Sequence, residues 1–301
     1  MTLPSPNITI RDLRTIDELV QLKTVEKAVW QMSEEDAVPL TLAIALKAAG
    51  NIFVGAFDRE SRHAHKKEKS DKEKLVGFAF GFLGREHGRT TIHSHMLAVL
   101  ETHRHLNLGM QLKQAQRERA LAMGVHEMTW TFDPLQSRNA HFNFAKLGVL
   151  ADTYKVDFYG PQTSSILHRN GTDRLWVRWL LDSRRVRDRL AGKNRRAETM
   201  DALRLLAPLV RFNGDGRPER ATLSEALSRQ RVGIEIPGDI MAVELSDMGL
   251  AREWREATRW AFRESLKSGF MVTDYCRSIR GQQGPGAYLL ERGTVEGVGE
   301  P

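Results

Sequence analysis

The stretch RHLNLGMQL, residues 104–112, follows a run of strand-forming residues, and the junction places residues that could bind an anion at the start of a helix. Gly109 lies where a helical pattern begins, and Arg104 precedes it by one turn or so. The first N–H groups of a helix have no acceptor within the helix, and a glycine allows an anion to approach them closely. We therefore predict a pyrophosphate site at residues 104–110.

Two histidines on the strand before this turn could move a proton. His93 and His95 are two positions apart, so in a regularly alternating strand they face the same side as Leu97. An imidazole pKa near neutrality suits removal of a proton from an amine. Glu101 and His103 lie closer to the turn and are further candidates. The alternative is that these side chains only make hydrogen bonds with neighbouring strands.

The elements that must position these residues are read from hydrophobic periodicity and helix caps. Between residues 8 and 183 the expected order is strand, helix, helix, three strands, helix, strand, short helix and two strands. Thr15 and Glu18 form a capping-box pattern at the first helix. This order predicts a mixed α/β sheet with helices on its faces, because a doubly wound fold would alternate strand and helix throughout.

One strand in this series, GFAFGFLG, has two chemically different faces. Phe78, Phe80 and Phe82 share one face, which can fill a core, and glycine and alanine occupy the other, which allows a helix or ligand to approach closely. The polar segment 59–73 that precedes the strand is predicted to be a surface loop that ligand binding does not require.

The element order and the turn resemble the GNAT superfamily of acetyl-CoA-dependent N-acetyltransferases. The turn of that family reads Arg/Gln-x-x-Gly-x-Gly/Ala; Arg104 takes its first place, Gly109 its last, and Asn107 stands where the first glycine is usual. Asparagine tolerates positive φ better than most residues, so the departure is mild. TFDPLQSRNAHFNFAKLG also resembles the strand-to-helix segment that lies beside pantetheine in that family.

The resemblance implies an acyl-CoA cosubstrate, normally acetyl-CoA, no metal, and direct transfer of the acyl group to the amine of a small acceptor. The residues that it assigns to CoA are Leu97, Ala98, Val99, Arg104, His105, Leu106, Asn107, Leu108, Gly109, Met110, Asn139 and Asn143. Asn139 is alternatively the N-cap of its helix. Direct transfer needs no protein nucleophile, so Cys276 is expected to be structural.

The residue that protonates the departing thiolate is where the sequence departs from the family. Many members place a tyrosine at the position of Phe144, counted back from Gly148. The acid is then Tyr154, Tyr159, Tyr275 or solvent, or the chemistry has been lost. A CoA-binding module without turnover is therefore the first alternative function.

Composition limits the other classes. The 301 residues are 41% hydrophobic and 28% charged, which is typical of a globular protein, and no apolar run is long enough to span a membrane. The N-terminus lacks a signal-peptide pattern, and Cys276 is the single cysteine, so we expect a cytoplasmic location. The net charge is +7, and residues 184–231 hold 13 Lys/Arg against 6 Asp/Glu. Few aromatic residues accompany these arginines, so a nucleic-acid partner is the less favoured alternative.

The sequence divides into a GNAT-like domain at 1–183, a basic linker or helical region at 184–231, and a smaller α/β extension at 232–301 that could be a half-GNAT-like lobe. Arg255 and Arg259 lie one turn apart on the long helix of the extension. They could grip the carboxylate of an anionic acceptor, or they could lie on a solvated face beside acidic neighbours. Oligomeric state is left open, with a homodimer as one option.

Overall fold

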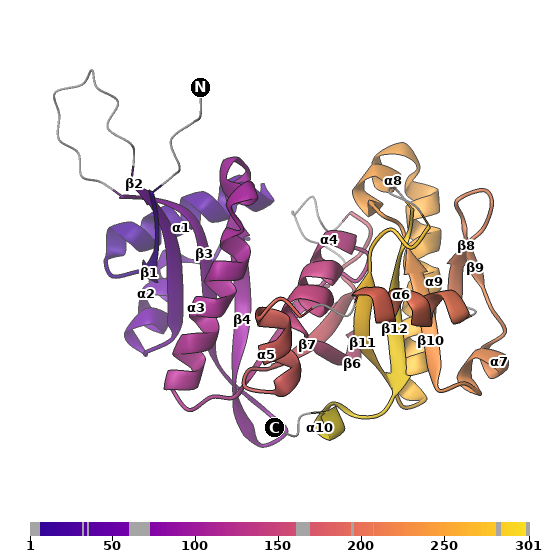
Figure 1. Cartoon of the computed structure of the whole chain (residues 1–301). Helices are drawn as coiled ribbons and strands as arrows, with labels where there is room; N and C mark the ends of the chain where they lie inside the picture. Colours follow the sequence, from indigo (N-terminus) through magenta and orange to yellow (C-terminus); the bar gives the residue numbers. More distant parts are fainter. Residues whose placement is uncertain are drawn as a thin grey trace. The chain divides into compact units, whose positions relative to one another are not determined.

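The computed structural model describes residues 7–31, 33–34, 36–59, 73–160, 169–193, 196–206, 208–280 and 284–298. These residues form two compact units, the first ending at Met128 and the second beginning at Thr129 (Figure 1). This division differs from the boundaries at 183 and 231 that composition suggests, because strands from both sides of residue 183 share one sheet in the second unit. Residues 60–72 of the predicted polar loop lie outside the described ranges.

The first unit is built on four antiparallel strands in the order β1-β2-β3-β4. Its elements are β1 (Asn7–Asp12), α1 (Ile16–Trp30), α2 (Leu40–Ala48), β2 (Ile52–Arg59), β3 (Glu73–Glu86), β4 (Arg89–Val99), the 3₁₀ helix η1 (Glu101–Leu106) and α3 (Leu108–Ala122). Helix α1 begins with the predicted capping box of Thr15 and Glu18. The predicted order of strands and helices is confirmed here.

The phenylalanine face of β3 forms the core of the first unit. Phe78 and Phe80 are buried in one cluster with Leu19 and Leu22 of α1. Phe82, at the far end of this row, is only partly buried against the same cluster. The predicted apolar face of β3 is therefore confirmed, and its solvent exposure increases from Phe78 and Phe80 to Phe82.

The glycine face of β3 lies under α3, on the opposite side of the sheet from α1 and α2 (Figure 1). A Cβ added at Gly77 would lie 2.9 Å from the carbonyl oxygen of Ala98 and 3.4 Å from Cδ1 of Leu112 in α3. A Cβ added at Gly81 would lie 3.0 Å from Nε2 of Gln116, also in α3. The missing side chains are what allow the helix to pack directly on the strand.

The second unit contains a sheet in the order β5-β7-β6-β11-β12-β10-β8-β9. Its elements are β5 (Glu127–Phe132), α4 (Ser137–Ala140), the π helix η2 (His141–Leu147), β6 (Leu150–Lys155), β7 (Arg174–Leu180), α5 (Arg184–Leu190), α6 (Arg196–Leu205), β8 (Val210–Phe212), β9 (Pro218–Arg220), α7 (Leu223–Leu227), β10 (Arg231–Ile236), α8 (Ile240–Ser246), α9 (Met248–Lys267), β11 (Phe270–Cys276), β12 (Gly286–Arg292) and α10 (Val295–Val298).

The C-terminal extension is joined to the preceding strands by backbone pairing. Strand β11 pairs antiparallel with β6, where Val272 lies opposite Ala151, and β12 pairs with both β11 and β10. Helix α9 buries the apolar side chains of Trp254 and Ala261. The extension therefore shares a sheet and a core with β6 and β7.

Several basic residues of 184–231 are used inside the second unit. Arg189 is buried and donates to Oδ2 of Asp274 at 2.6 Å. Arg185 donates from Nε to the carbonyl oxygen of Gly148 at 2.9 Å. These contacts reduce the cationic surface that the sequence offers to a nucleic acid.

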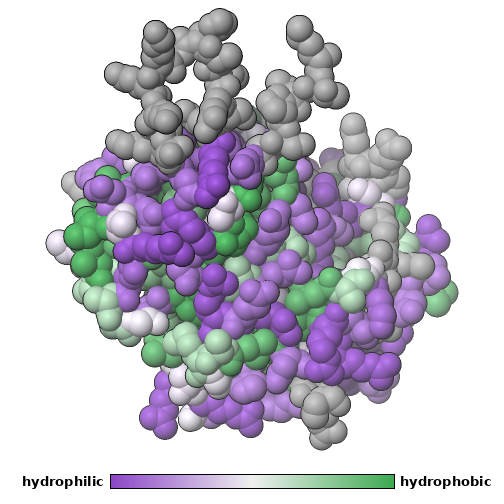
Figure 2. Space-filling model, turned by 60° about the vertical axis from the view of Figure 1, so that its left-hand side comes forward, coloured by the Kyte–Doolittle hydropathy of each residue, from purple (hydrophilic) through white to green (hydrophobic). Residues whose placement is uncertain are grey.

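The face turned forward in Figure 2 is largely hydrophilic, with smaller hydrophobic areas between the polar side chains. Among the helices described, none combines the length and the apolar composition that crossing a membrane requires.

The close packing of β4 and α3 around Gly77 predicts the effect of one added methyl group. Gly77→Ala should lower the free energy of unfolding by about 1–3 kcal/mol, because the new Cβ meets a backbone oxygen that cannot move aside. Urea denaturation measures this change. Gly214→Ala is the matched control, since its Cβ would enter open space. Equal stabilities of the two variants would contradict the packing described.

Candidate functional site

The junction between β4 and α3 differs in detail from the simple turn predicted. Strand β4 ends at Val99, and the 3₁₀ helix η1 carries the chain to Asn107. Asn107 has φ 56° and ψ 26°, the left-handed conformation that its place in the motif requires. Arg104 therefore lies within a 3₁₀ helix, one turn before α3, and not in an open turn.

The start of α3 has the chemistry of an anion site. The carbonyl oxygen of Asn107 accepts hydrogen bonds from the N–H groups of Met110 and Gln111. The N–H groups of Leu108 and Gly109 come before these and, in a regular helix, have no intrahelical acceptor. Together with the helix dipole they favour a negatively charged group.

The side chains of η1 surround this helix start with charge and imidazole. Arg104 and His105 are exposed, Leu106 is partly buried, and Leu108 is buried beneath them. The guanidinium of Arg104 lies 3.8 Å from the carboxylate of Glu101, and both side chains are mostly exposed. Such a surface pair is weak, so Arg104 can turn to another anion at little cost.

A buried polar cluster ties α3 to β4. Nζ of Lys113 donates to Oγ of Ser94 at 2.7 Å and to Oε1 of Gln116 at 3.3 Å, and Oγ of Ser94 donates to the same Oε1 at 2.9 Å. Burial lowers the pKa of Lys113 well below its ordinary value. The cluster fixes the helix against the strand, and the sequence pattern gave no sign of it because Lys113 reads as a surface residue.

A β-bulge at His95 changes which face of the sheet the following residues of β4 occupy. Phe80 pairs with Met96 and Gly81 pairs with Ser94, so His95 is the extra residue in β4. His93 lies opposite Phe82 and shares the phenylalanine face.

Beyond the bulge the alternation resumes with the opposite phase. Leu97 and Val99 lie opposite Ala79 and Gly77, on the face covered by α3, whereas Ala98 faces the phenylalanine core. The prediction that the histidines face the same side as Leu97 is therefore wrong, because it assumed an unbroken alternation.

The two imidazoles remain together despite the bulge. Their ring centroids are 6.5 Å apart, and His93 lies 5.5 Å from the ring of Phe82. Desolvation, with smaller contributions from His95 and Lys113, lowers the pKa of His93 to about 4. His95 keeps an exposed edge, but the surrounding protein also lowers its pKa by desolvation. Both rings are neutral near pH 7.

The two other proton-transfer candidates of the junction have different surroundings. Glu101 is exposed beside Arg104. His103 is turned towards the sheet, with Nε2 3.2 Å from Oδ2 of Asp58 and Nδ1 2.8 Å from the hydroxyl of Thr102. This favours a role for His103 in fixing η1 to the end of β2.

In the second unit, the two asparagines assigned to CoA are placed differently. Asn139 is exposed in α4, and the N-cap of that helix is Gln136, so the alternative role of Asn139 as N-cap is wrong. Asn143 is buried in η2, and its Oδ1 accepts a hydrogen bond from Nε1 of Trp130 at 3.3 Å. Asn143 therefore contributes to the packing of its own unit.

Phe144 and two of the candidate acids are also interior residues. Phe144 is fully buried, and its ring lies 5.8 Å from that of Tyr288. Tyr154 donates to Asp173 at 2.6 Å and Tyr275 donates to Ser137 at 2.8 Å. Burial is the main cause that raises the pKa of each of these two tyrosines. Tyr159 is 43% exposed and is the most accessible of the three.

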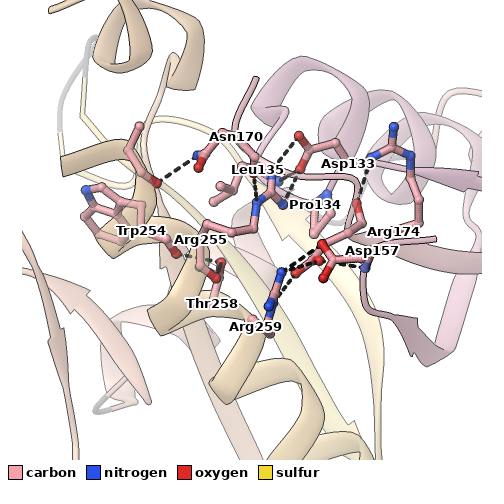
Figure 3. Close-up of polar contacts among 12 residues, drawn as sticks. Asp133, Pro134, Leu135, Asp157, Asn170, Arg174, Trp254, Arg255, Thr258 and Arg259 are labelled. Carbon is pink, nitrogen blue, oxygen red and sulfur yellow. Dashed lines mark hydrogen bonds and ion pairs between the residues drawn. The ribbon is translucent and has the colours of Figure 1, made fainter. Parts of the chain in front are cut away.

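Figure 3 shows that Arg255 is committed to partners within the second unit. It is buried, and its two terminal nitrogens donate to the two oxygens of Asp133 at 2.8 and 2.7 Å, while Nε donates to the carbonyl oxygen of Asn170 at 2.8 Å. Burial opposes the charge, but Asp133 outweighs it and raises the pKa of Arg255.

Arg259 has a similar arrangement. Its Nε and one terminal nitrogen each donate to Asp173 at 2.7 Å, and it also reaches Oδ1 of Asp157 at 3.2 Å. These hydrogen bonds raise the pKa of Arg259. The prediction that Arg255 and Arg259 grip an acceptor carboxylate is contradicted, because aspartates of this chain already occupy both forks. The alternative, that the two arginines pair with acidic neighbours on their own helix, is also wrong, because their partners Asp133 and Asp173 come from other elements.

Comparison with models of known protein families and with curated proteins found no match. Solved structures do match. The ribosomal-protein-S18-alanine N-acetyltransferase from Escherichia coli is 14% identical with a TM-score of 0.42, over 58% of this chain and 94% of that one. A Desulfovibrio desulfuricans protein described as an acetyltransferase of the GNAT family is 14% identical with a TM-score of 0.40, over 58% and 99%.

The resemblance is to acetyltransferases. A Salmonella typhimurium protein so described, solved with its cofactor acetyl-CoA, is 17% identical with a TM-score of 0.41, over 59% of this chain and 95% of that one. Roughly two fifths of the chain extend beyond the match.

The buried pair of Arg255 and Asp133 predicts a large loss of stability when one partner is removed. Arg255→Ala should lower the free energy of unfolding by about 3–5 kcal/mol, because the carboxylate of Asp133 would stay buried without its cation. Arg217→Ala removes an exposed pair with Glu253 and should cost less than about 1 kcal/mol. Chemical denaturation compares the two, and similar losses would show that the internal pair is not formed.

Proposed function

We propose that this chain binds acyl-CoA, normally acetyl-CoA, and transfers the acyl group directly to the amine of a small acceptor. The observation that carries the proposal is the start of α3, where Asn107 in the left-handed conformation turns the chain so that the N–H groups of Leu108 and Gly109 begin the helix. A pyrophosphate bound there would accept hydrogen bonds from these N–H groups and would form an ion pair with Arg104. The GNAT resemblance of the sequence supports the same assignment.

The remaining CoA contacts follow from the resemblance and stay predictions. The backbone of Leu97–Val99 is the proposed partner of the pantetheine arm. A backbone N–H of the same segment would donate a hydrogen bond to the carbonyl oxygen of the thioester and so polarise it. Asn139, which is exposed, is retained as a pantetheine ligand, whereas Asn143 is already engaged with Trp130.

In the proposed reaction the neutral amine nitrogen attacks the carbonyl carbon of the thioester. A carbon–nitrogen bond forms, the carbon–sulfur bond breaks, one proton leaves the ammonium for a base, and the CoA thiolate takes up a proton. With its pKa near 4, His93 holds a proton too weakly to be a good base near neutrality, so we assign this role to His95. Phe144 cannot supply the second proton, and Tyr159 or water would do so.

A second candidate function is CoA binding without turnover. Phe144, buried where many GNAT members have a tyrosine, favours it. Release of free thiol from acetyl-CoA in the presence of amines separates the two functions, because a binding module would hold CoA but release no thiol.

The pyrophosphate site predicts the effect of a charge at the start of α3. Gly109→Glu should weaken CoA binding by roughly tenfold or more, because a side chain and a negative charge would enter the anion site. Isothermal titration calorimetry with CoA measures the dissociation constant. Met123→Glu adds the same charge at the exposed far end of the same helix and should leave the affinity near that of the parent. Equal affinities of all three proteins would place the site elsewhere.

The assignment of the base predicts a pH profile. The rate should fall as the pH drops through the pKa of His95, which lies below that of a free imidazole because desolvation disfavours the charged ring. His95→Gln should lower kcat/KM by ~100-fold and remove this acidic limb. His93→Gln should keep the limb. Thiol release from acetyl-CoA across a pH series is the measurement, and a limb that persists in His95→Gln would reject the assignment.

A further inference from the structure

We propose that the acceptor is an amine with an uncharged, apolar carbon skeleton, such as an arylalkylamine, and that the ring of Phe82 selects it. The inference deepens the proposed function and rests on it, because it begins from His95 as the group that takes the proton of the amine.

The rings around His95 are aromatic. The ring centroid of Phe80 lies 5.8 Å from that of His95, and the centroid of Phe82 lies 5.9 Å away. His93 completes the group, 6.5 Å from His95 and 5.5 Å from Phe82. Both imidazoles lie beside these phenylalanines, because His93 pairs opposite Phe82 and the bulged His95 packs against Phe80 and Phe82.

Accessibility distinguishes the two phenylalanines. Phe80 is 2% exposed and stacks on Phe53 at 4.3 Å, so it serves the core. Phe82 and Met96 are only partly buried at the border of the same cluster. A molecule that approaches His95 would therefore meet the carbon surface of Phe82 first.

The geometry of proton transfer then places the acceptor. A nitrogen that gives its proton to His95 must lie about 3 Å from an imidazole nitrogen. The carbons attached to that nitrogen are then within reach of the ring of Phe82, whose centroid is less than 6 Å from that of His95. Apolar carbons gain from this contact, whereas a carboxylate would lose its water without gaining a partner.

The charges of the cluster favour the same class of acceptor. Desolvation keeps His93 and His95 neutral near pH 7, so neither offers a cation to a carboxylate. The arginine pair that the sequence suggested for an anionic acceptor is engaged with Asp133 and Asp173. The two arginines that were predicted to bind an anionic acceptor are therefore already paired within the chain.

The test compares three amines in a thiol-release assay with acetyl-CoA: phenethylamine, glutamate and 1,5-diaminopentane. Phenethylamine should have the highest kcat/KM, by about tenfold or more. Phe82→Ala should raise the KM for phenethylamine about tenfold with kcat little changed, because the lost contact positions the acceptor and takes no part in proton transfer.

Leu83→Ala is the matched control. Leu83 is the next residue of β3, it is 46% exposed, and it points to the opposite face of the sheet, so its truncation should leave the KM unchanged. If Phe82→Ala does not fold, Phe82→Leu keeps most of the core volume and should still raise the KM about threefold.

The outcomes separate this inference from the proposed function. A parent protein that prefers glutamate or diaminopentane, or a Phe82 variant with the KM of the parent, overturns the inference and leaves acyl transfer intact. A parent protein that releases no thiol with any of the three amines or a wider amine panel overturns acyl transfer and the inference with it.

Discussion

Helix α3 packs on a face of the sheet where Gly77 and Gly81 present no side chain, and an added Cβ there would lie 3.4 Å from Leu112 and 3.0 Å from Gln116. That contact fixes the height of the helix above β3 and β4, and the buried cluster of Ser94, Lys113 and Gln116 fixes it against sliding. The start of the helix is thereby held at the end of β4, with Leu108 as its buried anchor. An anion site made of backbone N–H groups needs such rigidity, because the donors cannot adjust to the ligand one by one.

A single extra residue gives strand β4 two functions. Before the bulge the side chain of His93 lies beside Phe82. After the bulge the side chains of Leu97 and Val99 face α3. The proposed proton-transfer group and the proposed pantetheine-binding backbone therefore come from one strand, on the two sides of the bulge. Aromatic neighbours desolvate the imidazoles and lower the pKa of both. Both rings are therefore neutral near pH 7, and their surroundings are suited to apolar carbon.

The order of elements, the capping box at Thr15 and the left-handed Asn107 could be predicted because each depends on neighbours within a few positions. The bulge at His95 could not, because it depends on the register with β3, and one shifted residue reversed the inferred faces. The same limit applies to Arg255, whose partner Asp133 lies 122 positions away. A pair of arginines one turn apart indicates a bidentate grip, but periodicity does not reveal whether the chain supplies the carboxylate itself.

The proposed function depends on CoA binding through its pyrophosphate at the start of α3. The most direct test is a titration of isotopically labelled protein with CoA, followed by the backbone amide resonances in NMR spectra. The amides of Leu108 and Gly109 should shift most. The same two should shift with 3′-phosphoadenosine 5′-diphosphate, which carries the pyrophosphate without the pantetheine arm. Saturable CoA binding that leaves both amide resonances unshifted would exclude a pyrophosphate site at the start of α3.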